Sequence, residues 1–199
     1  MSDKTPRWSS DYYPTPRAVG IAIGRWLMSR GADFGAFLDP AAGSGHLIEG
    51  MRDVFGESHW HAIEIDQSHE RDLDLCAEAH VIGDALAAVW PAVPVVANPP
   101  FNQLDAFWSR ISDHRKRHAV WCAALTPVAW WNAEKRRDVT RPDFMVSLGW
   151  RPTFHPKNGP AHKGSQDFLW AVLAPYAQPA CQWERVEKPV VATEWLRAE

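Results

Sequence analysis

Short apolar runs alternate with stretches of helical periodicity along the first half of the chain. A short apolar run bounded by turn residues is typical of a buried strand, whereas apolar positions three and four apart are typical of a helix packed on one face. Because the two patterns alternate, we expect a mainly parallel sheet with helices between its strands. The predicted strands are 37–39, 59–65, 80–82 and 93–97, and the predicted helices are 18–28, 47–55 and 68–79.

The first of these helices has signals at both ends. Thr15 is a good N-cap, Pro16 fits the first turn, and Gly31 follows the last apolar position. We therefore expect a helix ahead of the sheet, capped by Thr15.

The second half of the chain has readable patterns as far as residue 175. The polar stretch 155–167 contains glycine and proline and has the composition of an exposed functional loop. The tail after Pro175 has no clear pattern, so no element is predicted there. The expected elements are a helix over 104–111 leading into the basic segment 114–118, a strand over 119–125, a loop and helix over 127–137, and strands over 144–154 and 168–174.

Composition indicates one domain of ordinary size. The chain has 199 residues, of which 46% are hydrophobic, and such a chain can bury a core without disulfides. Cys76, Cys122 and Cys181 lack the paired spacing of metal ligands, so we expect reduced thiols. His59 and His61 have no third ligand nearby in the sequence, and no metal site is predicted. We see no bilayer-spanning stretch or signal peptide, and we expect a cytoplasmic protein that does not bind membranes.

Charge is distributed unevenly, although the net charge is only −3. Residues 39–84 contain eleven acidic and two basic residues, a balance of −9, whereas residues 102–168 contain six acidic and eleven basic residues, a balance of +5. A basic second half suits contact with a polyanion. Solvated charged faces explain such runs equally well.

The most informative segment is the corner formed by Asn98, Pro99, Pro100 and Phe101, which directly follows an apolar strand. It offers an amide oxygen, the carbonyl of a residue that cannot donate, and an aromatic face. Such a set can hold a planar group that carries an amine.

Acidic residues follow the preceding strands in the same way. Asp39, Glu64, Asp84 and Asn98 lie at or just beyond the carboxyl ends of four successive predicted strands. In an open α/β sheet these ends meet at one crevice, so we expect the four side chains to converge there. Taken singly, each acid could equally cap a helix or lie in solvent.

Three motifs in this order resemble the S-adenosylmethionine-dependent adenine-N6 DNA methyltransferases, in particular small phage or prophage members. They are Tyr12-Tyr13-Pro14-Thr15-Pro16, the loop Asp39-Pro40-Ala41-Ala42-Gly43-Ser44-Gly45, and the Asn98 to Phe101 corner. The resemblance covers most of the chain. It implies an α/β, single-domain, Rossmann-like class I methyltransferase fold, with a mostly parallel seven-stranded sheet, an antiparallel last strand and helices on both faces.

The same resemblance implies an organisation within residues 1–199. Residues 1–31 would form a helix closing the cofactor site, 32–101 the cofactor-binding half, 102–175 the substrate-facing half and 176–199 a tail. A separate target-recognition domain is absent from this scheme. We expect a monomer or weak dimer in the cytoplasm of a bacterial or phage-infected cell.

The resemblance also implies a cofactor site for S-adenosylmethionine. The glycine loop would pass close to the methionine part, with Asp39 beside the ammonium, Glu64 on the ribose hydroxyls and Asp84 on the adenine amine. Thr15 and its neighbours would close over the methionine end. The expected cofactor-binding residues are Tyr13, Thr15, Asp39, Ala41, Gly43, Gly45, Glu64, Ile65, Asp84, Ala85 and Asn98.

In the catalytic hypothesis, the Asn98 side-chain oxygen and the Pro99 carbonyl accept the two protons of the target amine, and Phe101 stacks on its ring. In duplex DNA the base must first be rotated out of the stack. Phe154 could contact the flipped base or pack inward as a strand residue. The residues expected to contact substrate are Arg136, Arg137, Phe154, Lys163 and Asp167.

Other functions fit the same motifs. An enzyme with the same corner could methylate adenine in structured RNA, and a relative with Tyr in place of Phe101 methylates a glutamine amide in protein. A catalytically silent cofactor-binding module is a third possibility. A nicotinamide cofactor is disfavoured, because it gives Pro40 and the Asn98 corner no role.

Overall fold

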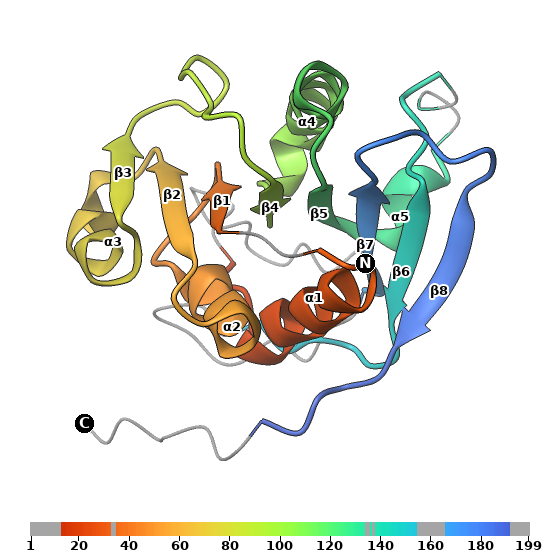
Figure 1. Cartoon of the computed structure of the whole chain (residues 1–199), viewed down its shortest axis with the longest axis horizontal. Helices are drawn as coiled ribbons and strands as arrows, with labels where there is room; N and C mark the ends of the chain where they lie inside the picture. Colours follow the sequence, from red (N-terminus) through yellow and green to blue (C-terminus); the bar gives the residue numbers. More distant parts are fainter. Residues whose placement is uncertain (1–12, 33–34, 134–135, 137, 155–165, 192–199) are drawn as a thin grey trace, which may run out of the picture.

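The computed structural model describes residues 13–32, 35–133, 136, 138–154 and 166–191. They form one eight-stranded sheet in the order β3-β2-β1-β4-β5-β7-β6-β8 (Figure 1). The strands are β1 Ala36–Asp39, β2 His59–Glu64, β3 Ala79–Ile82, β4 Val95–Ala97, β5 Cys122–Pro127, β6 Phe144–Leu148, β7 Phe168–Leu173 and β8 Gln182–Val186. The helices are α1 Arg17–Ser29, α2 His46–Phe55, α3 Glu70–Cys76, α4 Leu104–His118 and α5 Val128–Trp131, with short 3-10 turns η1 Gln67–His69 and η2 Phe101–Gln103.

Strand direction follows the prediction for most of the sheet. β1 to β5 are mutually parallel along the sheet, and β7 is antiparallel to both β5 and β6. The predicted α/β Rossmann-like fold is therefore confirmed. The sheet has eight strands rather than seven, because β8 adds to the edge parallel to β6, and β7 is thus not the last strand.

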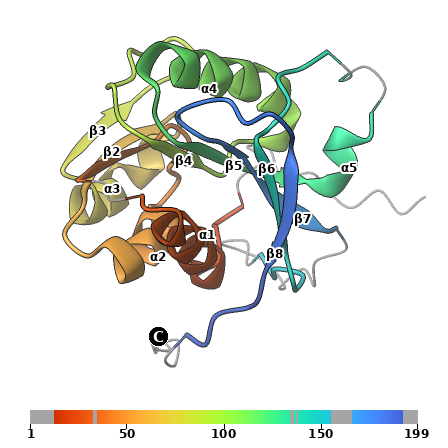
Figure 2. The same cartoon turned by 45° about the vertical axis from the view of Figure 1, so that its right-hand side comes forward.

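Helices cover both faces of the sheet. Figure 2 shows α1 and α2 on one face and α4 on the other. Successive residues of β5 alternate between the two cores, with Ala123 and Leu125 packed toward α1 and α2, and Cys122 and Ala124 packed toward α4. A strand buried on both faces reads as a continuous apolar run, which is why its sequence shows no period of two.

The close packing of α1 on α2 depends on two glycines. A Cβ atom on Gly50 would lie 2.7 Å from the Arg17 carbonyl oxygen, and one on Gly20 would lie 3.1 Å from the Gly50 Cα atom. Any side chain at Gly50 would therefore push the two helices apart. This contact fixes α1 on α2 and so places the segment that precedes α1.

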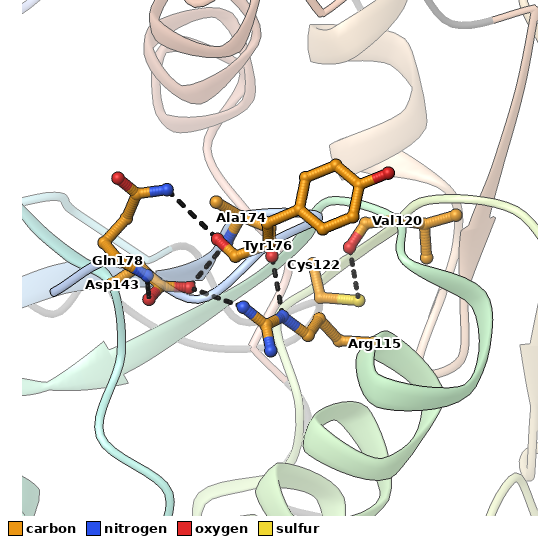
Figure 3. Close-up of polar contacts among 7 residues, drawn as sticks. All are labelled: Arg115, Val120, Cys122, Asp143, Ala174, Tyr176 and Gln178. Atoms are coloured by element: carbon orange, nitrogen blue, oxygen red, sulfur yellow. Dashed lines mark hydrogen bonds and ion pairs between the residues drawn. The ribbon is translucent and has the colours of Figure 1, made fainter.

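A buried polar cluster around Asp143, the Asp143 cluster, ties the C-terminal part of α4 to the end of the sheet where β6 begins and β7 ends (Figure 3). The Asp143 carboxylate accepts from the backbone N–H groups of Ala174 and Gln178 at 2.9 and 2.7 Å and pairs with the Arg115 guanidinium at 3.3 Å. Arg115 also donates to the Ala174 carbonyl at 2.6 Å. Arg115 is thus occupied structurally and is not free to contact a phosphate.

Several element boundaries differ from the sequence prediction. α4 extends to His118, so the basic segment 114–118 belongs to the helix, where cations favour the negative end of its dipole. α3 is shorter than the expected 68–79, because Ala79 already pairs in β3. β6 ends at Leu148 instead of residue 154. The alternation of strand and helix also fails among the described residues, since residues 83–94 join β3 to β4 and residues 174–181 join β7 to β8 without a helix.

The N-cap prediction for α1 is wrong as well. Pro16 occupies the cap position and no side chain caps the helix. The Thr15 hydroxyl accepts instead from the side chain of Asn98. Within the described part of the chain, no helix is long and apolar enough to cross a membrane.

Candidate active site

A cavity lies at the carboxyl ends of β1 to β4, where the sequence places its acidic residues. Its empty space is about 820 Å³, including the part that opens to solvent. The predicted cofactor residues that line it are Tyr13, Thr15, Ala41, Gly43, Glu64, Ile65, Asp84, Ala85 and Asn98. Asp39 and Gly45 are not among its lining residues. The structure therefore brings together residues from four separate strand ends and from the segment before α1.

The glycine loop between β1 and α2 forms one wall of the cavity. Gly43 has a φ of 54° and donates its N–H to the Glu64 carboxylate at 2.7 Å. Ala42 donates to the Ile63 carbonyl at 3.1 Å, which ties the loop to the neighbouring strand β2. α2 begins directly after the loop, so its first backbone N–H groups lie at this wall and favour an anionic group.

Gly45 is required by packing within the protein. Its φ is 83°, and a Cβ atom there would lie 2.1 Å from the Sγ atom of Cys76 in α3. The positive φ and the approach of Cys76 explain why this position is glycine, and the contact of Gly45 with a cofactor stays a prediction. Its hydrogen atom makes room for α3.

Asp39 lies beneath the loop and is 1% exposed. Its carboxylate accepts from the Ala41 N–H at 3.1 Å. Burial raises the pKa of Asp39 to about 7, and the nearby Glu64 charge adds to the rise. Asp39 therefore supports the glycine loop through its hydrogen bond with Ala41 and does not line the cavity. The expected contact with an ammonium group is not possible at the cavity surface in this conformation.

Glu64 and Asp84 hold the loops that follow their strands and also line the cavity. The two oxygens of Glu64 accept from the N–H groups of Gly43 and Asp66, at 2.7 and 2.8 Å, and Asp84 accepts from the Leu86 N–H at 2.8 Å. Both residues also line the cavity. They organise the loops after their strands, and each carboxylate oxygen retains a second lone pair for a ligand.

Asn98 is held in one orientation by the segment before α1. Its Nδ2 atom donates to the Tyr13 carbonyl at 3.2 Å and to the Thr15 hydroxyl at 3.1 Å. Its Oδ1 atom is buried and has no hydrogen-bond partner among the described residues. A buried acceptor without a partner costs roughly 1–3 kcal/mol, so this atom is poised to accept from a bound donor.

An aromatic cluster made of Tyr13, Phe101, Phe154 and Phe168 lies beside Asn98. The rings of Tyr13 and Phe101 are near-parallel, with centroids 6.0 Å apart and an interplanar angle of 18°. Phe154 contacts Tyr13 and Phe168 edge to face at 6.0 and 5.2 Å. Phe154 is 7% exposed, so it packs inward, and Tyr13 and Phe168 lie between it and Phe101.

The predicted substrate contacts are less well placed. Arg136 donates to Asp105 at 2.7 Å and its guanidinium lies 4.5 Å from the centre of the Trp130 ring, so its charge is used within the protein. Asp167 pairs with Arg151 at 2.8 Å on the surface. Arg136 is therefore a poor candidate for a phosphate contact. Arg137 and Lys163 lie outside the described residues.

Sequence reasoning missed several residues that line the cavity. Gln103 and Phe107 follow the corner on one face of the helix, and His46 follows the glycine loop, where its ring nitrogen lies 2.6 Å from the Ser44 hydroxyl. The four-residue spacing of Gln103 and Phe107 after the corner was a usable signal. His69 also lines the cavity, and its signal is weak, because a lone histidine in a polar helix carries no motif.

Two of the cysteines are unsuited to covalent chemistry. Burial raises the pKa of Cys76 to about 11 and that of Cys122 to about 12. A thiol with so high a pKa forms little thiolate near neutral pH. In the part of the chain that the structure describes, no group of three or more His, Cys, Asp or Glu side chains could hold a metal ion.

Comparisons with known proteins define the fold class. No protein-family profile and no curated protein matches the sequence. Among solved structures, 23S rRNA methyltransferase ErmE superposes with a TM-score of 0.57 at 16% identity, over 84% of this chain and 71% of that one. Thermoplasma acidophilum 1320 gives 0.52 at 18% identity, over 81% of this chain and 87% of that one. The fold is that of the class I S-adenosylmethionine-dependent methyltransferases.

Proposed function

We propose that this protein is an S-adenosylmethionine-dependent methyltransferase that methylates the N6 amine of adenine in DNA. The observation that carries the proposal is the buried Oδ1 atom of Asn98, an acceptor without a partner among the described residues. It belongs to a residue that lines the cavity at the carboxyl ends of the strands. An acceptor held in this way suits a ligand that presents an N–H donor.

The cavity suits the proposed cofactor through its donors and acceptors. Glu64 would accept from the ribose hydroxyls and Asp84 from the adenine amine, while the backbone N–H groups at the start of α2 would bind the methionine carboxylate. Tyr13, Thr15, Ala41, Ile65 and Ala85 would complete the walls. Bound S-adenosylmethionine supplies an electrophilic methyl group.

The proposed chemistry at Asn98 compensates for a weak nucleophile. The lone pair of an exocyclic adenine amine is delocalised into the ring, so it must be localised on nitrogen before it can attack a methyl carbon. The Asn98 oxygen and the Pro99 carbonyl would accept hydrogen bonds from the two amine protons, which favours a tetrahedral nitrogen and stabilises its positive charge as the N–C bond forms. The methyl–sulfur bond would break in the same step, S-adenosylhomocysteine would leave, and one amine proton would pass to water. Pro100 would fix the turn that presents both acceptors.

The aromatic cluster supplies a platform for the target ring. Phe101 would stack on the base and Phe154 would contact its edge, which holds the amine in line with the methyl group. In duplex DNA such a contact requires base flipping, at a cost of roughly a few kcal/mol. Cations of the basic second half would offset that cost through phosphate contacts, with Arg137 and Lys163 as candidates.

Structured RNA is the second candidate substrate. Two structures with this fold carry RNA in their names, ErmE as a 23S rRNA methyltransferase and PH1948 from Pyrococcus horikoshii as a candidate RNA methyltransferase, the latter with a TM-score of 0.55 at 17% identity over 87% of this chain and 93% of that one. Adenine presents the same N6 amine in both nucleic acids, so the chemistry at Asn98 would be unchanged.

A substrate panel with labelled S-adenosylmethionine separates these candidates. Unmethylated DNA, total RNA and a protein extract are incubated in parallel with the enzyme. We expect label in DNA; label in RNA alone would replace the substrate and retain the mechanism, and label in protein alone would contradict the assignment to nucleic acid. Titration of S-adenosylhomocysteine into the Glu64→Ala and Asp84→Ala variants tests the cofactor site, where we expect each change to weaken binding about tenfold or more.

A further inference from the structure

Two residues from the segment before α1 define the orientation of the Asn98 amide. The Tyr13 carbonyl oxygen is an acceptor only, so the amide nitrogen must face it, at 3.2 Å. The second amide proton points to the Thr15 hydroxyl at 3.1 Å. Tyr13 and Thr15 lie 85 and 83 residues before Asn98 in the sequence.

We propose that Thr15 is a positioning residue for catalysis, because its hydroxyl fixes the plane of the Asn98 amide and so directs Oδ1 at the target amine. This inference rests on the proposed function. A primary amide that makes one hydrogen bond can still rotate about its terminal side-chain torsion, whereas two bonds from one nitrogen fix both the orientation and the plane. Thr15 is 5% exposed, so water cannot readily replace its hydroxyl.

The orientation also determines which substrates react. With Nδ2 bound to Tyr13 and Thr15, the free end of the amide is an acceptor, which favours a donor such as an exocyclic amine and disfavours a keto oxygen. An amide turned the other way would present N–H groups and bind the wrong class of group. Thr15 therefore contributes to selectivity for amines as well as to rate.

Two matched pairs of variants isolate the hydroxyl. Thr15→Val keeps the branched shape and removes the oxygen, and Thr15→Ser and Thr15→Ala both lack the methyl group and differ only in the oxygen. We expect kcat to fall about tenfold in Thr15→Val relative to wild type and in Thr15→Ala relative to Thr15→Ser, because each change removes one buried hydrogen bond at the reacting group. KM for DNA should change less than about twofold, and because Thr15 also lines the cavity, any rise in the Kd for S-adenosylhomocysteine should be much smaller than the fall in kcat.

Three outcomes would overturn the inference. Unchanged kcat in Thr15→Val would show that the hydroxyl is not needed, and an equal loss in Thr15→Ser and Thr15→Ala would assign the effect to packing. A proportional rise in the Kd for S-adenosylhomocysteine would assign Thr15 to the cofactor alone. If Thr15→Val fails to fold, the comparison of Thr15→Ser with Thr15→Ala decides the matter.

A readout without activity separates this inference from the proposed function. In the free protein, NMR should show slow exchange of the Asn98 side-chain amide protons in the wild type and in Thr15→Ser, and faster exchange in Thr15→Ala. Inactivity of the wild type on every substrate would overturn the proposed function together with the inference that rests on it. Normal turnover with unaltered kcat in Thr15→Val and Thr15→Ala would overturn the inference alone.

Discussion

At the residue scale, Asp39 shows how a buried charge affects the stability of the protein. Its carboxyl group is 1% exposed and accepts from the Ala41 N–H. Burial raises its pKa from 3.8 to about 7. The folded state therefore binds a proton more tightly than the unfolded state, and ionisation of Asp39 costs free energy of folding.

The raised pKa of Asp39 makes the stability of the folded protein depend on pH. Between the unfolded pKa of about 3.8 and the folded pKa of about 7, the folded state holds one more proton at Asp39 than the unfolded state, so stability falls as pH rises. We expect the Asp39→Asn variant to lose this dependence, because Asn can keep the bond from Ala41 without ionising. Urea unfolding of both proteins between pH 4 and 8 measures it. Parallel stability curves across that range would contradict the burial of an ionisable group here.

The sequence was informative about single residues wherever a motif was local. Asn98 to Phe101 are consecutive, and Asp39, Glu64 and Asp84 lie at or just beyond the ends of predicted strands. Strand ends alone therefore predicted that Glu64 and Asp84 would line one cavity, whereas Asp39 is buried and does not reach it. Thr15 was predicted to cap α1 because Thr before Pro is a common helix start. Its contact with Asn98 depends on how α1 packs against the sheet, and local sequence does not encode that distance.

At the element scale, the start of α2 and the end of α3 are in direct contact through Gly45 and Cys76. The Gly45 Cβ position lies 2.1 Å from the Cys76 Sγ atom, and the φ of Gly45 is 83°. The glycine is thus needed for two separate reasons, a left-handed backbone and a close approach between helices. Both must be met for the loop to form its wall of the cavity.

The two reasons can be separated by mutation. Gly31→Ala meets nothing within 4 Å at a φ of 74°, so it reports the left-handed cost alone, roughly 1–2 kcal/mol. We expect Gly45→Ala to destabilise the protein clearly more than Gly31→Ala does. Adding Cys76→Ala to Gly45→Ala should remove this excess and leave only the cost of the left-handed backbone. Chemical unfolding of the single and double variants measures this. Equal losses in Gly45→Ala and Gly31→Ala would contradict the packing role.

Element types were more predictable than element ends. The helices α1, α2 and α4 and all buried strands were predicted, because their apolar periodicity is strong. β8 was missed because Gln182–Val186 lies mostly exposed at a sheet edge and has polar residues on both faces. α4 was predicted too short because its last turn is basic and carries few apolar positions, although cations stabilise that end of a helix.

At the scale of the whole molecule, the Asp143 cluster joins α4, β6 and β7 at the end of the sheet opposite the cavity. We expect Asp143→Ala to reduce the free energy of unfolding by about 2–4 kcal/mol, since it leaves Arg115 and two backbone N–H groups without their buried partner. Because the cluster is remote from the cavity, the Kd for S-adenosylhomocysteine should stay within about twofold of wild type.

The matched control for this prediction is Asp113→Ala. Asp113 pairs with Lys116 at 3.5 Å on the exposed face of α4, the helix that also carries Arg115. Loss of this surface ion pair should lower the free energy of unfolding by less than about 1 kcal/mol. Equal effects of the two changes on thermal or chemical unfolding would show that the cluster contributes no more than a surface ion pair.

The overall topology was predictable in outline from alternating patterns and from the three motifs, and the confirmed α/β sheet with an antiparallel β7 agrees with them. The sequence did not predict the added β8, the helix-free connection over 83–94 or the placement of the basic side chains. The cations were expected on a substrate surface, but Arg115 and Arg136 are bound to buried or neighbouring groups within the fold. A count of charges along a sequence does not reveal which are used internally.

The most direct test of the account is the identity of the methylated product. DNA incubated with S-adenosylmethionine and either wild-type protein or the Asn98→Ala variant is digested to nucleosides and analysed by mass spectrometry, with Asn132→Ala as a matched control outside the cavity. We predict N6-methyladenine with wild type and Asn132→Ala, and a loss of about a hundredfold or more with Asn98→Ala despite retained binding of S-adenosylhomocysteine. Undiminished N6-methyladenine in Asn98→Ala would contradict the central role of this residue.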